Sequence, residues 1–212
     1  KLINEKIELK NTVYLEAGEV TGAEKATAVD ALTIVKSLNG KTIGDYIIIG
    51  VTLPVDYAES EQQILQHIER VKPDVVVSLG LAAGRFKITP ERIAINIKDG
   101  AADNKGVTLQ DQLIDNDGDD AYFSTLRIRA MVDYLKENGY PAEISNSAGT
   151  YLCNNVMYAV LHKYKDTSLQ AGFIHIPASH ELTIIDGKFP SWSMTDLTRS
   201  IELCIETLSM KA

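Results

Sequence analysis

Cys153 is the residue in this sequence best placed to act as a nucleophile. It lies within a run of small and polar residues, 147–155, and apolar residues recur at helical spacing after it, over residues 156–164. This pattern predicts a cysteine at the junction of a loop and a helix. Helix N-termini have unpaired N–H groups and a positive dipole end, which favour the reactive thiolate. The alternative is a small buried cysteine without a chemical role, because free cysteines are among the most buried residues.

A catalytic cysteine needs a base, and His175 is the strongest candidate among the four histidines. It lies near the end of an apolar run, 172–176, that reads as a strand. Functional residues of open α/β sheets gather at the carboxyl ends of strands. His180, in the polar stretch just beyond, is the competing candidate. His67 and His162 fall within helical patterns and are interpreted as ordinary helix residues.

We expect the group that orients such a base to lie on or near a neighbouring strand. Residues 75–80 form a β-branched run that reads as a buried strand and leads into a loop of small residues, 81–85. Glu91 and Arg92 then precede another strand-like run, 93–97. From the residue types alone, Glu91 is either the orienting acid or a solvent-exposed partner of Arg92.

Three segments taken together resemble the pyrrolidone-carboxylate peptidases, also called pyroglutamyl peptidase I, a family of cysteine exopeptidases. They comprise residues 80–85 continued by 88–96, residues 147–154, and residues 172–177. The similarity extends from about residue 34 to the C-terminus.

The resemblance implies a role for each candidate residue: Cys153 is the nucleophile, His175 the base and Glu91 the acid that orients the base. It implies hydrolysis of N-terminally pyroglutamylated peptides through a thioester, with no cofactor and no metal. It also implies a homotetramer.

The N-terminal segment departs from the family pattern. Family members begin with a strand followed by Thr-Gly-Phe-x-Pro-Phe and Asn-Pro, and these aromatics line the pyroglutamyl pocket. Residues 13–22 stand in their place here, without either phenylalanine or the proline. The predicted substrate-binding residues are Leu81, Arg85, Phe86 and Tyr14.

These four residues have different expected contributions. Leu81 stands where many family members have glutamine, Phe86 or Tyr14 is expected to form an apolar wall, and Arg85 is a weaker candidate for an oxyanion donor. We expect the departure to weaken substrate binding more than the chemistry. The alternatives are a thiol amidohydrolase of altered acyl specificity, or a catalytically weak homologue that binds a ligand.

Composition narrows the class of protein. The chain has 212 residues, 45% of them hydrophobic and 24% charged, as expected for a globular enzyme. We expect a single α/β domain spanning residues 1–212, with residues 1–30 divergent from the family pattern. A net charge of −8 argues against a nucleic-acid or anionic-membrane partner. Two cysteines do not make a disulfide framework, and a free catalytic thiol fits a reducing cytoplasm.

Strand-like and helical patterns alternate along the chain. Expected strands are 47–51, 75–80, 93–97, 142–145 and 172–176, and expected helices are 31–38, 59–71, 125–138, 154–164 and 194–210. This alternation predicts an α/β fold, a three-layer αβα sandwich around a twisted, mostly parallel sheet. The acidic stretch 115–120 is interpreted as a solvated turn, because it lacks the glutamate that closes a calcium loop.

Overall fold

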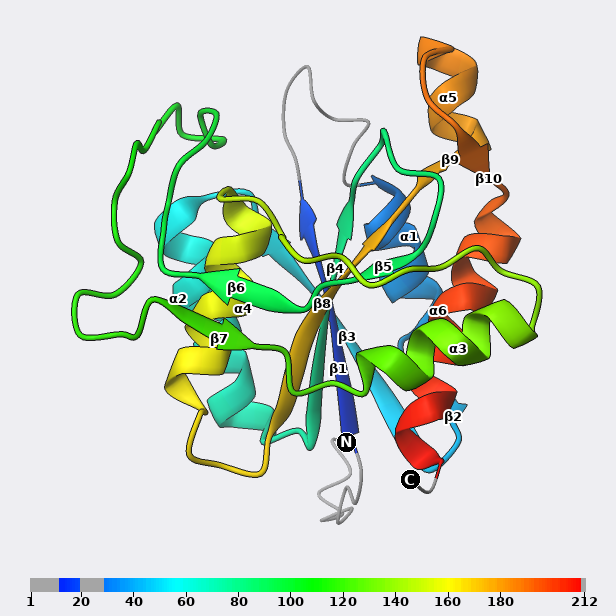
Figure 1. Ribbon diagram of the computed structural model, residues 1–212, viewed down its shortest axis with the longest axis horizontal. Coiled ribbons are helices and arrows are strands. Elements are labelled where there is room, and N and C mark those ends of the chain that lie inside the picture. Colours follow the sequence, from blue (N-terminus) through cyan, green and yellow to red (C-terminus); the bar gives the residue numbers. More distant parts are fainter. Residues whose placement is uncertain (1–11, 20–28, 211–212) are drawn as a thin grey trace, which may run out of the picture.

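A twisted sheet forms the centre of the computed structural model, which describes residues 12–19 and 29–210 (Figure 1). Its strands run in the order β2, β3, β1, β4, β8 and β5. Four of these strands are parallel, and the outer β2 and β5 are antiparallel to their neighbours. Their bounds are β1 Thr12–Glu19, β2 Thr42–Ile43, β3 Tyr46–Pro54, β4 Val75–Leu81, β5 Thr89–Pro90 and β8 Gln170–Ile176.

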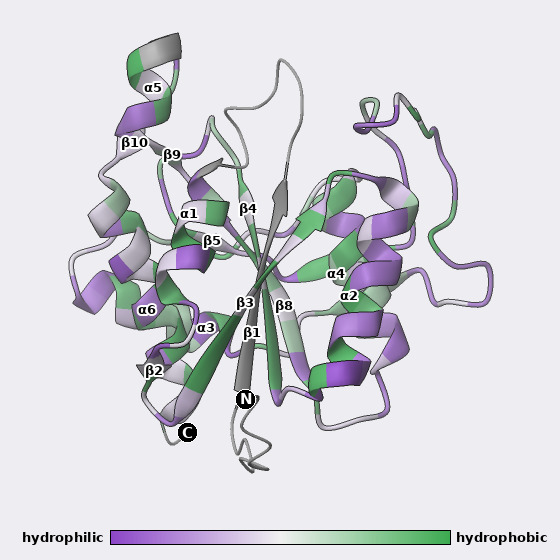
Figure 2. Ribbon diagram, turned by 180° about the vertical axis from the view of Figure 1, so that it is seen from behind, coloured by the Kyte–Doolittle hydropathy of each residue, from purple (hydrophilic) through white to green (hydrophobic). Residues whose placement is uncertain are grey.

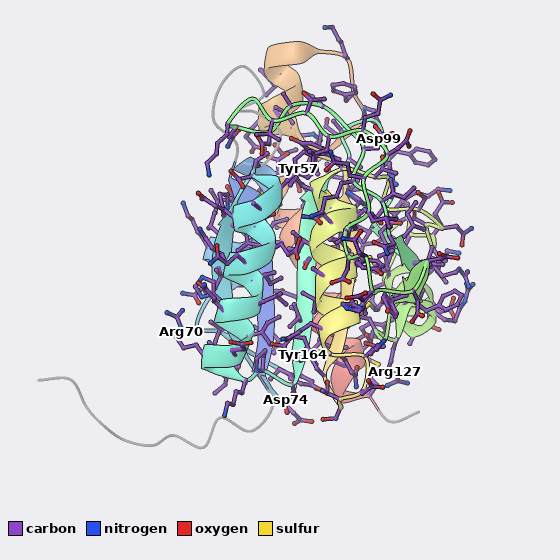
Figure 3. The ribbon with its side chains drawn as sticks, turned by 90° about the vertical axis from the view of Figure 1, so that its left-hand side faces the viewer. Tyr57, Arg70, Asp74, Asp99, Arg127 and Tyr164 are labelled. Atoms are coloured by element: carbon purple, nitrogen blue, oxygen red, sulfur yellow. The ribbon has the colours of Figure 1, made fainter. Side chains whose placement is uncertain are left out.

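Helices cover both faces of this sheet (Figure 1). On one face lie α1 (Val29–Leu38), α3 (Ile128–Glu137) and α6 (Met194–Ser209). On the other face α2 (Tyr57–Val71) and α4 (Leu152–Lys163) pack side by side, with Tyr57 towards one end of the pair and Tyr164 towards the other (Figure 3). The predicted three-layer α/β fold is therefore confirmed. Because buried parallel strands contact helices on both faces, they carry near-continuous apolar runs such as that of β4 (Figure 2).

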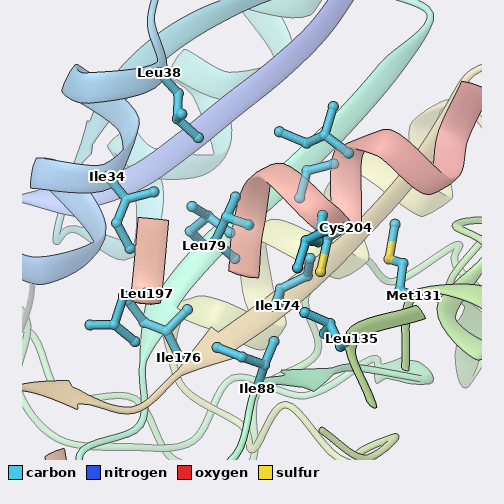
Figure 4. Packing of buried hydrophobic residues seen from close by; sticks show 14 of the residues in the cluster. Ile34, Leu38, Leu79, Ile88, Met131, Leu135, Ile174, Ile176, Leu197 and Cys204 are labelled. Atoms are coloured by element: carbon cyan, nitrogen blue, oxygen red, sulfur yellow. The ribbon is translucent and has the colours of Figure 1, made fainter. Parts of the chain in front are cut away.

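Each face of the sheet has its own hydrophobic core. The core beneath α1, α3 and α6 includes Ile34, Leu79 and Ile174 (Figure 4), and the core beneath α2 and α4 includes Ile64 and Phe173. Cys204 of α6 belongs to the first core and is fully buried. Burial raises the pKa of its thiol to about 12, as expected for a cysteine that contributes only packing.

Local capping explains where two of the helices begin. Asp56 accepts hydrogen bonds from the backbone N–H groups of Ala58 and Glu59 at 2.9 and 2.7 Å, which fixes the first turn of α2. Ser193 likewise accepts from the N–H of Asp196 at 3.0 Å at the start of α6. Within the described residues, no helix is both long and apolar enough to cross a membrane.

Three segments differ from the sequence-based expectation. Residues 93–97 supply only a short strand, β6 (Ile93–Ile95), which pairs with β7 (Ala121–Phe123) outside the main sheet. The expected strand 142–145 makes only isolated bridges, Ile88 to Ala142 and Glu91 to Ser145. The polar stretch after β8 forms a projecting arm of β9 (Ala178–Ser179), α5 (His180–Asp186) and β10 (Ser191–Trp192) (Figure 1).

Candidate active site

Cys153 is the second residue of α4, so the expected loop-to-helix placement is correct. The N-cap residue Tyr151 makes no side-chain capping bond. The first N–H groups of a helix have no partner within it, and the half-buried Cys153 belongs to this first turn. They are therefore available to a thiolate or to an oxyanion formed beside it.

Two buried asparagines anchor the start of α4, and sequence reasoning missed both. The Asn154 side chain accepts from the N–H of Ile95 at 2.9 Å and donates to the Ile95 and Ile97 carbonyls at 2.8 and 3.0 Å. Asn155 donates to the Tyr57 carbonyl at 3.0 Å. The only sequence signal was two amides directly after the cysteine, which does not reveal these distant backbone partners.

The sheet places His175 next to this thiol. His175 is the sixth residue of β8 and lies opposite Gly80 of β4. A Cβ atom at Gly80 would lie 3.2 Å from Cys153 Sγ, so the sulfur lies directly over that glycine. His175 and Cys153 are close enough to share a side-chain hydrogen bond. The missing side chain at Gly80 thus makes room for the thiol beside the imidazole.

Glu91 completes a line of three groups. It follows β5, whose Thr89 lies opposite His175, and its backbone N–H donates to the Phe173 carbonyl at 2.8 Å. Its side chain is fully buried, and Oε1 lies 2.7 Å from His175 Nδ1. With Nδ1 held by the carboxylate, Nε2 is the ring nitrogen left to face Cys153.

Electrostatics in this line favour a charged imidazole. Burial opposes charge on His175, but the negative charges and hydrogen bonds of Cys153 and Glu91 outweigh it and raise the pKa of His175 to about 9. Burial also opposes ionisation of Glu91. Hydrogen bonds from His175, Ser145 and Arg85 prevail there, so the pKa of Glu91 is lowered. The arrangement therefore suits a thiolate–imidazolium pair oriented by an ionised carboxylate.

Arg85 contacts the carboxylate of Glu91. Its guanidinium Nη1 is 2.8 Å from Glu91 Oε1 and 2.6 Å from Thr89 Oγ1. Its guanidinium therefore contacts the orienting acid and a residue of β5. The sequence places Arg85 and Glu91 only six residues apart, but the contact depends on the turn into β5, which no periodicity predicted.

The other predicted substrate-binding residues lie in different parts of the structure: Leu81 is at the end of β4 and Phe86 follows it, whereas Tyr14 is level with the start of β4. Leu81 ends β4, is half-buried and packs against the core beneath α1, α3 and α6. Phe86 is 57% exposed, and its carbonyl accepts from Trp192 Nε1 at 3.2 Å. The backbone of Tyr14 lies in β1 opposite Val76, but its side chain and residues 20–28 lie outside the described residues. The roles of all four residues, including Arg85, stay predictions.

The remaining histidines have other partners. His180, the competing base, begins α5, and its Nδ1 lies 2.9 Å from the Ser191 hydroxyl. His162 Nδ1 lies 2.8 Å from the Tyr122 hydroxyl, and His67 Nδ1 lies 2.7 Å from Arg70. Among the described residues, no group of three or more His, Cys, Asp or Glu side chains is arranged to hold a metal ion.

The space over Gly80 yields a prediction. In Gly80→Ala, the new methyl group would lie 2.7 Å from the buried Phe173 ring and 3.2 Å from Cys153 Sγ. We expect a loss of about 1–3 kcal/mol in the free energy of unfolding, because tightly packed sites resist added methyl groups, and slower alkylation of Cys153. Urea denaturation and iodoacetamide kinetics measure the two effects. Gly84→Ala is the matched control, since its new methyl group meets no atom of the described residues within 4 Å. Equal behaviour of the two variants would contradict the packing argument.

The sequence of this chain is similar to known peptidases over most of its length. The family model described as "Pyroglutamyl peptidase" matches residues 20–211. A curated pyrrolidone-carboxylate peptidase of Halalkalibacterium halodurans is 51% identical over 178 residues, covering 82% of this chain and 89% of that protein. One of Lysinibacillus sphaericus is 54% identical over 176 residues, covering 82% and 86%.

Solved structures agree with the sequence comparison. The pyroglutamyl peptidase I of Bacillus amyloliquefaciens superposes with a TM-score of 0.89 at 30% identity, covering 95% of this chain and 96% of that one. The pyrrolidone carboxyl peptidase of Thermococcus litoralis has a TM-score of 0.87 at 36% identity, covering 93% and 92%. The extent of these matches in sequence and in structure shows that this chain belongs to the pyroglutamyl peptidase family.

Proposed function

We propose that this chain is a cysteine peptidase that removes N-terminal pyroglutamyl residues from peptides, with Cys153, His175 and Glu91 carrying the reaction. The observation that supports these roles most strongly is the geometry around His175. One ring nitrogen is held by a fully buried carboxylate, and the other faces a thiol at a helix N-terminus. A nucleophile, a base and a group that orients the base are the parts that acyl transfer through a thiol requires.

The first half of the reaction forms a thioester. The Cys153 thiolate attacks the carbonyl carbon of the pyroglutamyl group, and the carbonyl oxygen becomes an oxyanion. Backbone N–H groups at the first turn of α4 stabilise this charge. The carbon–nitrogen bond then breaks, and the leaving amine takes the proton from His175, which becomes neutral.

The second half releases the acid. Neutral His175 removes a proton from a water molecule, whose oxygen attacks the thioester carbon. The carbon–sulfur bond breaks, pyroglutamate leaves, and the thiolate–imidazolium pair is restored. Glu91 holds the imidazole in one orientation throughout, because its carboxylate accepts the Nδ1–H bond in both protonation states.

The homotetramer implied by the family resemblance and the reducing cytoplasm that fits a free catalytic thiol are part of this proposal. A reduced compartment is needed because Cys153 must remain a free thiol to react. Exposed apolar side chains on and beside the projecting arm support subunit contacts, with Ile184 83% and Phe189 39% exposed.

Release of a fluorescent amine from a pyroglutamyl amide tests the function. We expect turnover that iodoacetamide abolishes, and at least about a hundredfold lower kcat/KM for the matching prolyl amide, which lacks the lactam carbonyl and carries a charged amine. Labelling of Cys153 without turnover of either amide would contradict the proposed substrate. Equal turnover of both amides would contradict the proposed specificity.

A further inference from the structure

Arg85 is tied to the acid and to the base of the site at once. Its Nη1 donates to Glu91 Oε1, the same oxygen that faces His175 Nδ1. It also donates to Thr89 Oγ1, which in turn donates to the His175 carbonyl at 3.3 Å. Its Nη2 lies 3.4 Å from the carbonyl of Ser147, in the loop that leads to the nucleophile. Every one of these contacts is directed at a group that holds the site in place.

We propose that Arg85 is a positioning residue that keeps Glu91 ionised during the part of the cycle in which His175 is neutral. The inference rests on the catalytic roles proposed above. It assigns Arg85 to the orientation of the base, in place of the substrate-binding role expected from the sequence.

The Glu91 carboxylate is buried more deeply than its partner Arg85. The Glu91 side chain has no exposed surface, whereas that of Arg85 is 33% exposed. A buried carboxylate remains charged only where cations or hydrogen bonds compensate it. In the resting enzyme the His175 imidazolium supplies one such cation. Once His175 has given its proton to the leaving amine, that cation is gone.

At that stage Arg85 is the compensating charge that remains. A guanidinium stays protonated at any physiological pH, so its charge does not vary through the cycle. A protonated Glu91 would lose the negative charge that strengthens its bond to Nδ1–H, and water attack depends on His175 acting as a base. Loss of Arg85 should therefore slow hydrolysis of the thioester more than its formation.

The sign of the pH effect follows from the charges around the pair. Among the described residues, the charged and titratable groups that act on Glu91 and His175 are each other, Cys153 of α4, and Arg85 of the loop between β4 and β5. Arg85 is a positive charge that favours the deprotonated form of its neighbours. Its removal should therefore move the acidic limbs of the pH profiles for Cys153 alkylation and for kcat to higher pH, by about half a unit to one unit.

The test compares Arg85→Met, Arg85→Lys and Arg92→Met. Arg92 is the matched control, because it is the next residue after Glu91 yet its Nε donates to Asn146 Oδ1 at 2.7 Å. Two profiles are measured against pH: the rate of Cys153 alkylation by iodoacetamide, and kcat with the size of the initial amine burst for a pyroglutamyl amide. Arg85→Gln replaces Arg85→Met if the latter is insoluble.

We expect Arg85→Met to lower kcat about tenfold or more and to show a burst of amine release. It should also shift the acidic limbs of both profiles to higher pH. Arg85→Lys should restore both limbs to their wild-type positions, and Arg92→Met should move neither. A fall in kcat with unmoved limbs, or a change confined to KM, would overturn the inference. The alkylation profile needs no peptide turnover, so a shift there without peptidase activity would uphold the inference and reject the proposed function. Turnover of the pyroglutamyl amide with an unshifted alkylation profile would uphold the proposed function and reject the inference.

Discussion

Cys153→Ser is expected to abolish peptidase activity while leaving the fold intact. A serine hydroxyl is ionised far less readily than a thiol, and the pairing of a helix N-terminus with His175 is suited to a thiolate. We expect kcat/KM for a pyroglutamyl amide to fall by about a thousandfold or more. Steady-state kinetics measure the loss, and circular dichroism checks the fold.

The second cysteine provides the matched control for this variant. Cys204 is fully buried in the core beneath α1, α3 and α6, away from the proposed chemistry, so Cys204→Ser should retain full activity with at most a modest loss of stability. Near-normal turnover by Cys153→Ser, or inactivation of a folded Cys204→Ser variant, would contradict the proposed nucleophile.

His175→Ala is expected to have an effect of similar size. Without the imidazole, the thiol loses its ion-pair partner and the leaving amine loses its proton donor, so we expect about a thousandfold lower kcat. The pKa of His175 is raised to about 9, so the native imidazolium loses its proton as the pH rises through that value. The wild-type kcat/KM profile should therefore have an alkaline limb near pH 9, and the variant should lack it.

His180→Ala tests the choice between the two candidate bases. The His180 ring bonds to the Ser191 hydroxyl in the projecting arm, so its loss should leave the pH profile of the enzyme unchanged. A larger loss of activity in His180→Ala than in His175→Ala would show that the base had been assigned wrongly.

Sequence reasoning predicted the parts of the molecule whose signals are local or periodic. The apolar runs of β4 and β8 and the spacing of α2 identified strands and helices, and with them the three-layer fold. The position of Cys153 at the start of α4 followed from the change in pattern around it. The resemblance to the peptidase family then selected His175 and Glu91, which the geometry brings together.

The remaining features depend on contacts between distant or irregular segments. The apolar pattern over residues 93–97 is the same whether a strand enters the main sheet or, as β6 does, pairs with β7 in a separate two-stranded sheet. The side-chain amides of Asn154 and Asn155 form hydrogen bonds with backbone groups dozens of residues away, so no local pattern reveals them. The contact of Arg85 with Glu91 depends on the turn into β5, which no local pattern predicts.

The deep burial of Cys204 also makes the protein a reporter of its own unfolding. A thiol with no exposed surface, whose pKa is raised to about 12, reacts with a modifying reagent only after the layers of the fold separate. In the Cys153→Ser background, the rate of labelling at Cys204 would report the fraction of molecules in which this core is open. It would thus measure the free energy of opening in water, without denaturant and without an assay of catalysis.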